Sequence, residues 1–250
     1  MKYLKALKTK KGRDETRQFI IEGKKFVDEI PESWQVCQYV ASQRFAATND
    51  LAKYQARAAC DIVRDSIFDS LADTVSPQGL LAVCQKREWQ LSDLLNSNAP
   101  SFILVGENLN DPGNIGALMR TAAAAGANGI VLTSGSGDIY NPKVLRAAAG
   151  AVLRMPFITD ISVQDTAGWL ADNNIPIFAA HPRGSILPYR LDLKSGFCFF
   201  VGNESHGLSE EAANHATTLV SLPMVNDTES LNASVAGSIL LYEAVRQRLN

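Results

Sequence analysis

The sequence has few of the residues that build metal centres and disulfide frameworks. Its 250 residues include four cysteines and three histidines. The cysteines are far apart, and none forms a CxxC pair or a Cys/His group with the spacing of a metal site. They are Cys37, Cys60, Cys84 and Cys198. We therefore expect reduced thiols and no bound metal.

Long apolar runs are also missing. No stretch approaches the roughly 20 consecutive apolar residues that a membrane-spanning helix needs. The basic start MKYLKALKTKKGR is not followed by the apolar region of a secretory signal. These absences argue against a membrane protein and predict a cytoplasmic location. Hydrophobic residues make up 46% and charged residues 20% of the chain, which is typical of a globular protein with a buried core.

An excess of positive charge is absent as well, because the formal net charge is −2. Overall charge therefore gives no sign of a nucleic-acid partner. The first 25 residues differ from the rest, with nine lysine and arginine side chains against three acidic ones. Such a basic terminus either contacts phosphates or forms a solvated helix face, and charge alone leaves both interpretations open.

Two kinds of hydrophobic pattern divide the chain into a domain at 1–90, a linker at 91–100 and a domain at 101–250. Short alternating apolar runs predict a small α/β domain in the first part. In the last part, longer apolar runs alternate with helical segments, the pattern of a parallel sheet covered on both faces. We expect strands there at 102–106, 129–133, 175–180, 197–202 and 217–224, and helices at 113–126, 141–150, 163–173, 208–215 and 230–249.

The first candidate for a functional site is ENLNDPGNIGALMRTAAAAGA (107–127), where a strand ends and a helix begins. Open parallel sheets bind ligands beyond the carboxyl ends of their strands, which is where this loop must lie. Asn114 and Arg120 are its polar candidates. Taken alone, Asn114 is more often a helix cap, and Arg120 more often a surface residue or one half of an ion pair.

A second strand-to-helix loop is VGNESHGLS (201–209). Its two glycines, Gly202 and Gly207, allow the backbone to approach a ligand closely. Many loops of this kind contain glycine, so the signal is weak by itself. Glu204 is equally well explained as a first-turn acid favoured by the helix dipole.

The third candidate runs from a strand through a polar loop into the last helix, SLPMVNDTESLNASVAGSILLYEAVRQRL (221–249). Ser230 and Asn232 have the residue types of helix caps. Val235, Ile239 and Tyr242 recur at helical spacing, which predicts that they form the packed face of this helix.

In this order and spacing, PGNIGALMRTA, VGNESHGLS and LPMVNDTESLNASVAGSILLYEAVRQR resemble the three sequence motifs of the SpoU (TrmH-type) family of RNA 2′-O-ribose methyltransferases. The resemblance covers nearly the whole of residues 101–250. Residues 11–29 and 73–83 also resemble the family's substrate-binding domain. The resemblance implies an α/β fold whose parallel sheet ends in a deep C-terminal trefoil knot, preceded by a small α/β domain that binds RNA.

The resemblance further implies S-adenosylmethionine as the cofactor, ribosomal or transfer RNA as the substrate, and a homodimer packed through the last helix and the first motif. The motif positions that hold the cofactor fall on Gly202, Leu222, Met224, Asn226 and Leu231. The positions that the family uses in catalysis fall on Asn114, Arg120, Glu204, Ser230 and Asn232.

Methyl transfer from a sulfonium needs neither metal nor a covalent enzyme intermediate, because the methyl group is already activated. It needs the ribose oxygen in line with the methyl group, and the loss of a weakly acidic hydroxyl proton. A guanidinium is a poor base. We therefore expect Arg120 to hold the adjacent phosphate and polarise the hydroxyl, with the proton leaving late through that phosphate or water. Asn114, Glu204 and Asn232 would fix the nucleotide and the loops.

Two alternatives remain at this point. A dinucleotide-binding Rossmann enzyme is disfavoured, because the first strand of the larger domain is not followed by GxGxxG or by an acidic residue placed to bind a ribose. The other alternative, a non-catalytic RNA-binding member of the same fold, is disfavoured by the full set of polar motif residues.

Overall fold

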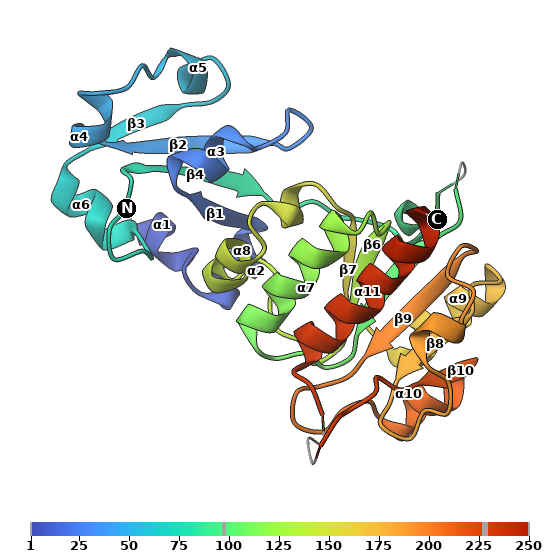
Figure 1. Ribbon diagram of the computed structural model, residues 1–250. Coiled ribbons are helices and arrows are strands. Elements are labelled where there is room, and N and C mark those ends of the chain that lie inside the picture. The colour runs from blue at the N-terminus through green and yellow to red at the C-terminus, as the bar shows by residue number, and fades with distance from the viewer. Residues whose placement is uncertain (1, 97–98, 227–229, 250) are drawn as a thin grey trace. The chain divides into compact units, whose positions relative to one another are not determined.

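The chain folds into two compact units in a computed structural model that describes residues 2–96, 99–226 and 230–249 (Figure 1). One unit consists of Met1–Glu88 and Tyr140–Leu153, and the other of Trp89–Ile139 and Arg154–Asn250. None of the helices within the described ranges is long and apolar enough to cross a membrane.

The smaller unit is built on a four-stranded mixed sheet in the order β1-β4-β2-β3. Strand β4 pairs antiparallel with β1 and β2, whereas β3 runs parallel to β2. Five of the six residues of β4 are buried, so this strand lies at the centre of the core. The elements are α1 (Lys2–Ala6), α2 (Lys10–Thr16), β1 (Gln18–Glu22), α3 (Lys24–Asp28), β2 (Val36–Ser42), α4 (Gln43–Ala46), α5 (Ala52–Gln55), β3 (Cys60–Val63), α6 (Asp65–Leu71), β4 (Leu80–Gln85), α8 (Pro142–Ala147) and the 3-10 helix η2 (Ala151–Leu153).

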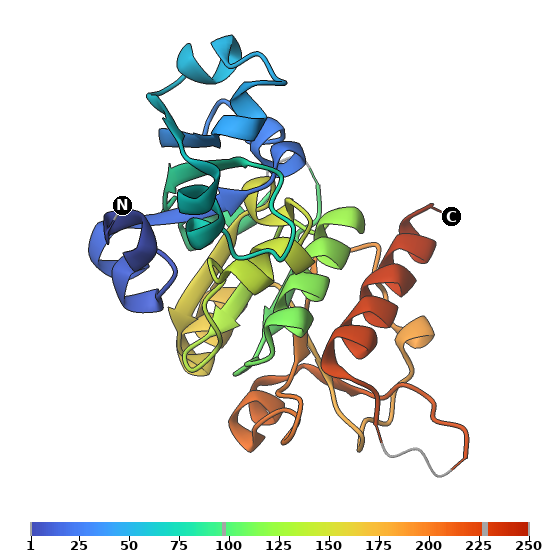
Figure 2. The ribbon, with the colours of Figure 1, turned by 90° about the vertical axis from the view of Figure 1, so that its left-hand side faces the viewer.

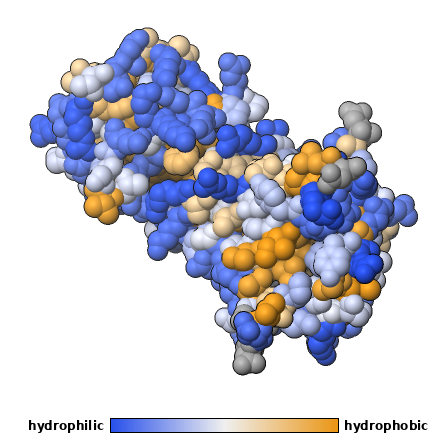
Figure 3. All heavy atoms as spheres, in the orientation of Figure 1, coloured by the Kyte–Doolittle hydropathy of each residue, from blue (hydrophilic) through white to orange (hydrophobic). Residues whose placement is uncertain are grey.

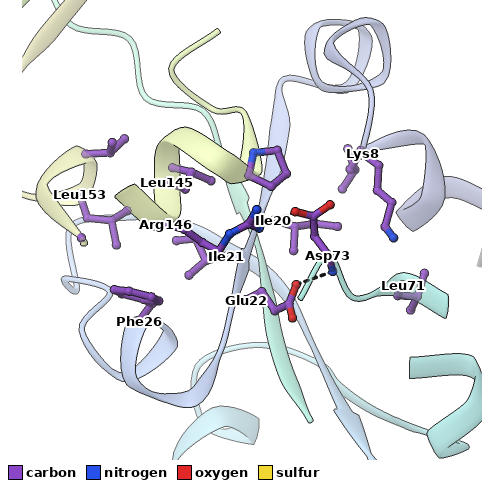
Figure 4. A pocket seen from close by; sticks show the side chains of 14 residues that line it. Lys8, Ile20, Ile21, Glu22, Phe26, Leu71, Asp73, Leu145, Arg146 and Leu153 are labelled. Atoms are coloured by element: carbon purple, nitrogen blue, oxygen red, sulfur yellow. Dashed lines mark hydrogen bonds and ion pairs between the residues drawn. The ribbon is translucent and has the colours of Figure 1, made fainter. Parts of the chain in front are cut away.

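The segment Tyr140–Leu153 belongs to the smaller unit although it connects two strands of the other sheet. The indole N–H of Trp34 donates a hydrogen bond to the carbonyl oxygen of Leu153 at 2.8 Å. Figure 4 shows Arg146 and Leu153 on one side of a small apolar cavity of about 50 Å³, with Arg146 paired to Asp73. The helix expected at 141–150 thus packs with the N-terminal residues and not with the parallel sheet.

The larger unit is a six-stranded sheet in the order β10-β8-β9-β5-β6-β7. All its neighbouring strands are parallel, which confirms the predicted parallel sheet. Every residue of the central strands β5, β6 and β9 is buried, as expected for strands covered on both faces. The elements are η1 (Leu91–Leu94), β5 (Phe102–Gly106), α7 (Pro112–Ala124), β6 (Gly129–Thr133), β7 (Phe157–Ile161), α9 (Val163–Asp172), β8 (Ile177–Ala180), η3 (Pro188–Arg190), β9 (Phe197–Val201), α10 (Glu210–His215), β10 (Thr218–Val220) and α11 (Ala233–Leu249).

The edge strand β7 is the one strand of this sheet that the hydrophobic pattern does not predict. Its sequence FITDI has a single buried residue, Phe157. An edge strand has a neighbour on one side only, so it lacks the continuous apolar run of the central strands.

Helices cover both faces of the large sheet. Leu170 of α9 and Ala212 of α10 belong to the same buried cluster as Ile103 and Val105 of β5. On the opposite face α7 and α11 lie side by side in both views (Figures 1 and 2). Their close approach depends on Gly237, because a Cβ atom there would lie 2.5 Å from Cδ2 of Leu118.

The buried face of α11 is not the predicted one. Three of its buried residues are small and two are leucines: Ala233, Gly237, Ala244, Leu240 and Leu241. Val235, Ile239 and Tyr242 are 46%, 44% and 53% exposed, so the prediction that they form the packed face is wrong for the single chain. Figure 3 shows apolar surface gathered in this region. Small residues face α7 because they allow the two helices to pack closely. The larger apolar side chains of Val235, Ile239 and Tyr242 consequently lie on the exposed face of α11.

A polar cluster in the smaller unit makes its stability sensitive to acid. The carboxylate of Asp28 accepts hydrogen bonds from Lys24 at 2.5 Å, Lys53 at 2.7 Å and the hydroxyl of Tyr54 at 2.8 Å. Burial alone would raise the pKa of Asp28, but these hydrogen bonds outweigh it and lower that pKa to about 2.

We expect Asp28→Asn to lower the free energy of unfolding by about 1–2 kcal/mol at pH 7, after a discount for partial exposure of the carboxylate. A depressed carboxyl pKa stabilises the fold above the unfolded value of about 3.9, and this contribution is lost as pH falls through the folded value. Asp28→Asn therefore loses less stability than the wild type between about pH 4 and pH 2. Urea unfolding across this range tests the prediction, and equal pH dependence of both proteins would contradict it.

Candidate active site

The three predicted motifs meet at the carboxyl edge of the parallel sheet. The loops after β5, β9 and β10 all leave the sheet at this edge, because its strands run in one direction. The loops after β9 and β10 line a cavity of about 580 Å³, together with the loop after β8 and the start of α11. A cavity of this size is suited to a small organic ligand, for which pockets of about 300–1,000 Å³ are usual.

The structure places the ten predicted site residues in three groups. Asn114 is buried and does not line the cavity, but it binds a residue that does. Arg120, Asn226 and Asn232 are exposed and lie outside the cavity lining. The six residues that line the cavity are Gly202, Glu204, Leu222, Met224, Ser230 and Leu231.

Glu204 is anchored to the loop that follows β5. The side-chain amide of Asn114 donates to Oε1 of Glu204 at 2.9 Å, and the backbone N–H groups of Asp111 and Asn110 donate to this carboxylate at 3.3 and 3.5 Å. Burial tends to raise the pKa of Glu204, but the hydrogen bond from Asn114 and the bonds from backbone N–H groups outweigh it and hold that pKa below its usual value. Glu204 is therefore an ionised hydrogen-bond acceptor and a weak base.

The alternative explanations of Asn114 and Glu204 do not fit their positions. Asp111 is the N-cap of α7, because its side chain accepts from the backbone N–H of Asn114 at 2.8 Å. The side chain of Asn114 is consequently available to Glu204. Glu204 is not a first-turn acid, since the next helix begins at Glu210.

Asn232 and Arg120 behave differently. The side-chain oxygen of Asn232 accepts from the backbone N–H groups of Ser234 and Val235 at 2.9 and 3.3 Å, so this residue does cap α11. Arg120 is exposed on α7, and it has no hydrogen bond or ion pair with any residue in the described part of the chain.

Gly202 is required by the course of the backbone. A Cβ atom at this position would lie 2.1 Å from the carbonyl carbon of Gly207 and 2.2 Å from the backbone nitrogen of Leu208. Asn203 and Gly207 close the loop with two backbone hydrogen bonds of 3.0 and 2.9 Å. Gly202 thus allows the loop to fold back on itself at the cavity wall.

Polar residues absent from the predicted site also line the cavity. His181 and Arg183 follow β8, and Asn203, Ser205 and His206 surround Glu204. Their signal in the sequence is position, since each lies just beyond the carboxyl end of a strand in a parallel sheet. Among the residues described, no group of three or more His, Cys, Asp or Glu could hold a metal ion.

Two family profiles together span most of the chain. The SpoU rRNA Methylase family matches residues 101–242, and the MRM3-like substrate binding domain matches residues 1–82. The chain belongs to the SpoU rRNA methylase family.

Named relatives resemble the chain over most of its length. The 23S rRNA (guanosine(2553)-2′-O)-methyltransferase RlmP of Bacillus subtilis is 28% identical over 95% of this chain and 92% of its own. The 23S rRNA (guanosine-2′-O-)-methyltransferase RlmB of Xylella fastidiosa is 31% identical over 74% of this chain and 77% of its own. The crystal structure of an AdoMet-bound rRNA methyltransferase from Sinorhizobium meliloti has a TM-score of 0.90 and 30% identity, and the match covers 100% of this chain and 95% of that one.

Replacement of Gly202 tests whether the folded-back loop forms the cofactor site. We expect Gly202→Ala to weaken the binding of S-adenosylmethionine at least about 30-fold, or about 2 kcal/mol, because the Cβ atom would push the loop apart. Gly168→Ala in α9 is the matched control, because a Cβ atom there meets nothing within 4 Å. Calorimetric titration of both variants measures the effect, and unchanged affinity in Gly202→Ala would refute it.

Proposed function

We propose that this protein transfers the methyl group of S-adenosyl-L-methionine to a ribose 2′-hydroxyl in ribosomal or transfer RNA. The observation that carries the proposal is the cavity at the carboxyl edge of the sheet, into which the first two motifs deliver Glu204 already oriented by Asn114. The non-catalytic alternative would not need this oriented pair. The named relatives are RNA 2′-O-methyltransferases, which favours the same conclusion.

The cavity lining fits the cofactor. Leu222, Met224 and Leu231 supply apolar surface for its adenosine part, and Gly202 leaves backbone groups accessible beside them. When bound, the cofactor supplies an activated methyl group.

The polar residues of this chain would bind and orient the nucleotide. Glu204 is held as an ionised acceptor suited to ribose hydroxyl groups or base N–H groups. Ser230 offers a hydroxyl at the same cavity. Arg120, with its guanidinium exposed, is suited to the phosphate next to the target ribose. Asn232 caps α11 between Leu231 and Ala233 of the cavity lining, and Asn226 lies two residues after Met224 of that lining.

We also propose a homodimer whose interface is built on α11 and α7. The exposed stripe of Val235, Ile239 and Tyr242 is the surface that a second copy would cover, as expected for contiguous apolar surface on a helix. Arg120 lies on α7, so such an interface would bring it beside the second copy. This arrangement would account for the position of Arg120 outside the cavity of its own chain.

The smaller unit is the proposed RNA-binding part. Not all of the basic terminus is available for phosphates, because Arg13 is buried and Lys8 donates to the carbonyl oxygens of Ser70 and Ala72. An open hollow of about 660 Å³ is a second candidate, since Lys24, Lys25 and Arg44 line it, although Lys24 is paired with Asp28 and Arg44 with Asp69. The match to a substrate binding domain supports this assignment.

A trefoil knot and a cytoplasmic location complete the proposal. The loop after β8 packs tightly against the end of β10, where Ser221 donates its backbone N–H to the carbonyl oxygen of Ile186 at 3.0 Å. A Cβ atom at Gly184 would lie 2.5 Å from the carbonyl carbon of Val220. Such close passage of two loops supports a threaded arrangement of the C-terminal segment. The third motif includes residues 227–229, which lie outside the described residues.

The direct test is incubation of the protein with labelled S-adenosylmethionine and RNA that lacks this modification, followed by mapping of the labelled nucleotide. A label at a ribose 2′-oxygen supports the proposal. A label on a base, or none in the presence of bound cofactor, rejects it.

Replacement of Arg120 distinguishes a phosphate clamp from a surface residue. We expect Arg120→Ala to lower the single-turnover rate at least about 100-fold, or about 2.7 kcal/mol, with little change in cofactor affinity. Arg120→Lys restores part of the rate, because a point charge lacks the planar fork of the guanidinium. Arg190→Ala, at an exposed arginine that does not line the cavity, is the control. A wild-type rate for Arg120→Ala would contradict the assignment of Arg120 as a phosphate-binding residue.

Replacement of Ile239 tests the dimer. Ile239→Asp places a charge in the proposed interface, so we expect a shift from dimer to monomer in analytical ultracentrifugation at micromolar concentration. Val75→Asp is the control, because Val75 is fully exposed in a loop of the smaller unit. A wild-type protein that is monomeric and fully active would contradict the proposal.

A further inference from the structure

The proposed reaction releases a proton from the ribose hydroxyl, and few of the described residues at the cavity are able to accept it. Among those residues, the titratable and charged side chains of the lining are Glu204, His181, His206 and Arg183. An arginine is an ineffective acceptor because it stays protonated. Glu204 is weakened as a base, because Asn114 and backbone N–H groups already donate to its carboxylate. Of these four side chains, the two histidines are the better acceptors.

The orientation of the Asn203 side chain is fixed by its neighbours. Its Nδ2 donates to the carbonyl oxygen of Asn108 at 2.7 Å, and a carbonyl oxygen can only accept. Its Oδ1 accepts from the backbone N–H groups of Ser205 at 2.8 Å and His206 at 3.2 Å. Rotating the amide by half a turn would set two donors against these N–H groups, so the observed orientation is the stable one.

That orientation fixes the tautomer of His206. Nδ1 of the His206 ring lies 3.3 Å from Oδ1 of Asn203, which is an acceptor. The tautomer with the ring proton on Nδ1 is therefore favoured in the neutral imidazole, because this proton can be donated to Oδ1, and Nε2 then carries the lone pair. A histidine held in this way by an acceptor on Nδ1 has the arrangement of a general base.

His181 has the opposite tautomer. The backbone N–H of Arg183 donates to Nδ1 of His181 at 3.0 Å. Nδ1 is therefore unprotonated, and the proton of the neutral ring is on Nε2, which makes Nε2 a donor. Two histidines thus line one cavity with opposite roles, and His206 is the one that offers a free lone pair.

We propose that Nε2 of His206 accepts the ribose 2′-hydroxyl proton during methyl transfer, in place of the phosphate or water expected from the sequence, and this inference rests on the proposed function. The ribose oxygen forms a bond to the methyl carbon while the carbon–sulfur bond breaks, and that electron pair stays on sulfur as a neutral thioether. The hydroxyl proton moves to Nε2 and gives an imidazolium, which later returns the proton to water. Asn203 acts as a positioning residue through its contact with Nδ1.

The charged surroundings suit this role. Ionised Glu204 lies two residues before His206 in the same loop, and its charge is opposite in sign to that of the imidazolium. Arg183 lines the same cavity but pairs with Glu210 at 2.8 Å, which offsets its charge. Proton transfer by a positioned side chain typically contributes about 100-fold or more to a rate.

The test is the pH dependence of single-turnover methyl transfer to RNA with saturating cofactor. The wild-type rate should fall with unit slope at low pH, because protonation removes the lone pair of Nε2. His206→Gln should lose this limb and about 100-fold of the plateau rate, with cofactor affinity within about twofold of the wild type. Added imidazole should restore the rate of His206→Ala in proportion to its free-base concentration.

Two further histidine variants serve as matched controls. His181→Gln should keep the acid limb, because its ring is a donor in the same cavity. His215→Gln changes a histidine at the end of α10 that does not line the cavity, so rate and profile should both stay at wild-type values.

The outcomes separate this inference from the proposed function. If wild-type protein methylates the ribose but His206→Gln keeps both the rate and the acid limb, His206 is not the acceptor and the methyltransferase assignment stands. A reduced rate without rescue by imidazole and with the limb intact also rejects His206 as the base. If wild-type protein transfers no methyl group to RNA, the proposed function itself fails.

Discussion

The parallel pairing of β5 with β9 is the constraint on which the site depends. Their register sets Gly106 opposite Val201, so the loops that follow both strands begin side by side although about a hundred residues separate them in the chain. The backbone N–H of Glu107 continues the ladder to the carbonyl oxygen of Val201 at 2.8 Å. Three residues beyond Val201, Glu204 reaches Asn114. The contact between the first two motifs thus follows from strand order.

Polar contacts then hold the loop after β9 at both ends. At its start, Asn203 binds the backbone of Asn108, a residue in left-handed conformation with φ +49°. At its end, the buried carboxylate of Glu107 accepts from the backbone N–H and hydroxyl of Ser209, the N-cap of α10. Glu204 and His206 lie between these anchors. A loop fixed in this way presents its side chains in place before a substrate arrives, which is the condition for electrostatic preorganisation.

Local patterns in the sequence predict those parts of the molecule whose environment is uniform. Central strands such as β5 are apolar throughout, and the three motifs identify the loops at the carboxyl edge. The hydrophobic pattern does not predict the edge strand β7, because this strand is partly exposed to solvent and has no continuous apolar run. The buried face of α11 depends on the packing of Gly237 against Leu118. These two residues are far apart in the sequence, so the spacing of apolar residues within α11 does not predict their contact. The roles of Asn203 and His206 likewise depend on hydrogen bonds visible only in the folded loop.

The course of the chain limits how the two units can be studied separately. The chain passes from one unit to the other three times, because Tyr140–Leu153 leaves the parallel sheet and returns to it. Tyr140, Val144 and Leu153 are buried, and a buried side chain of this kind contributes about 1.5–3 kcal/mol. Removing the N-terminal residues would leave this segment without its partners, including Trp34. Loss of cofactor binding after such a truncation would therefore measure damage to the connection between β6 and β7. Single substitutions on the surface of the smaller unit are the informative way to separate RNA binding from catalysis.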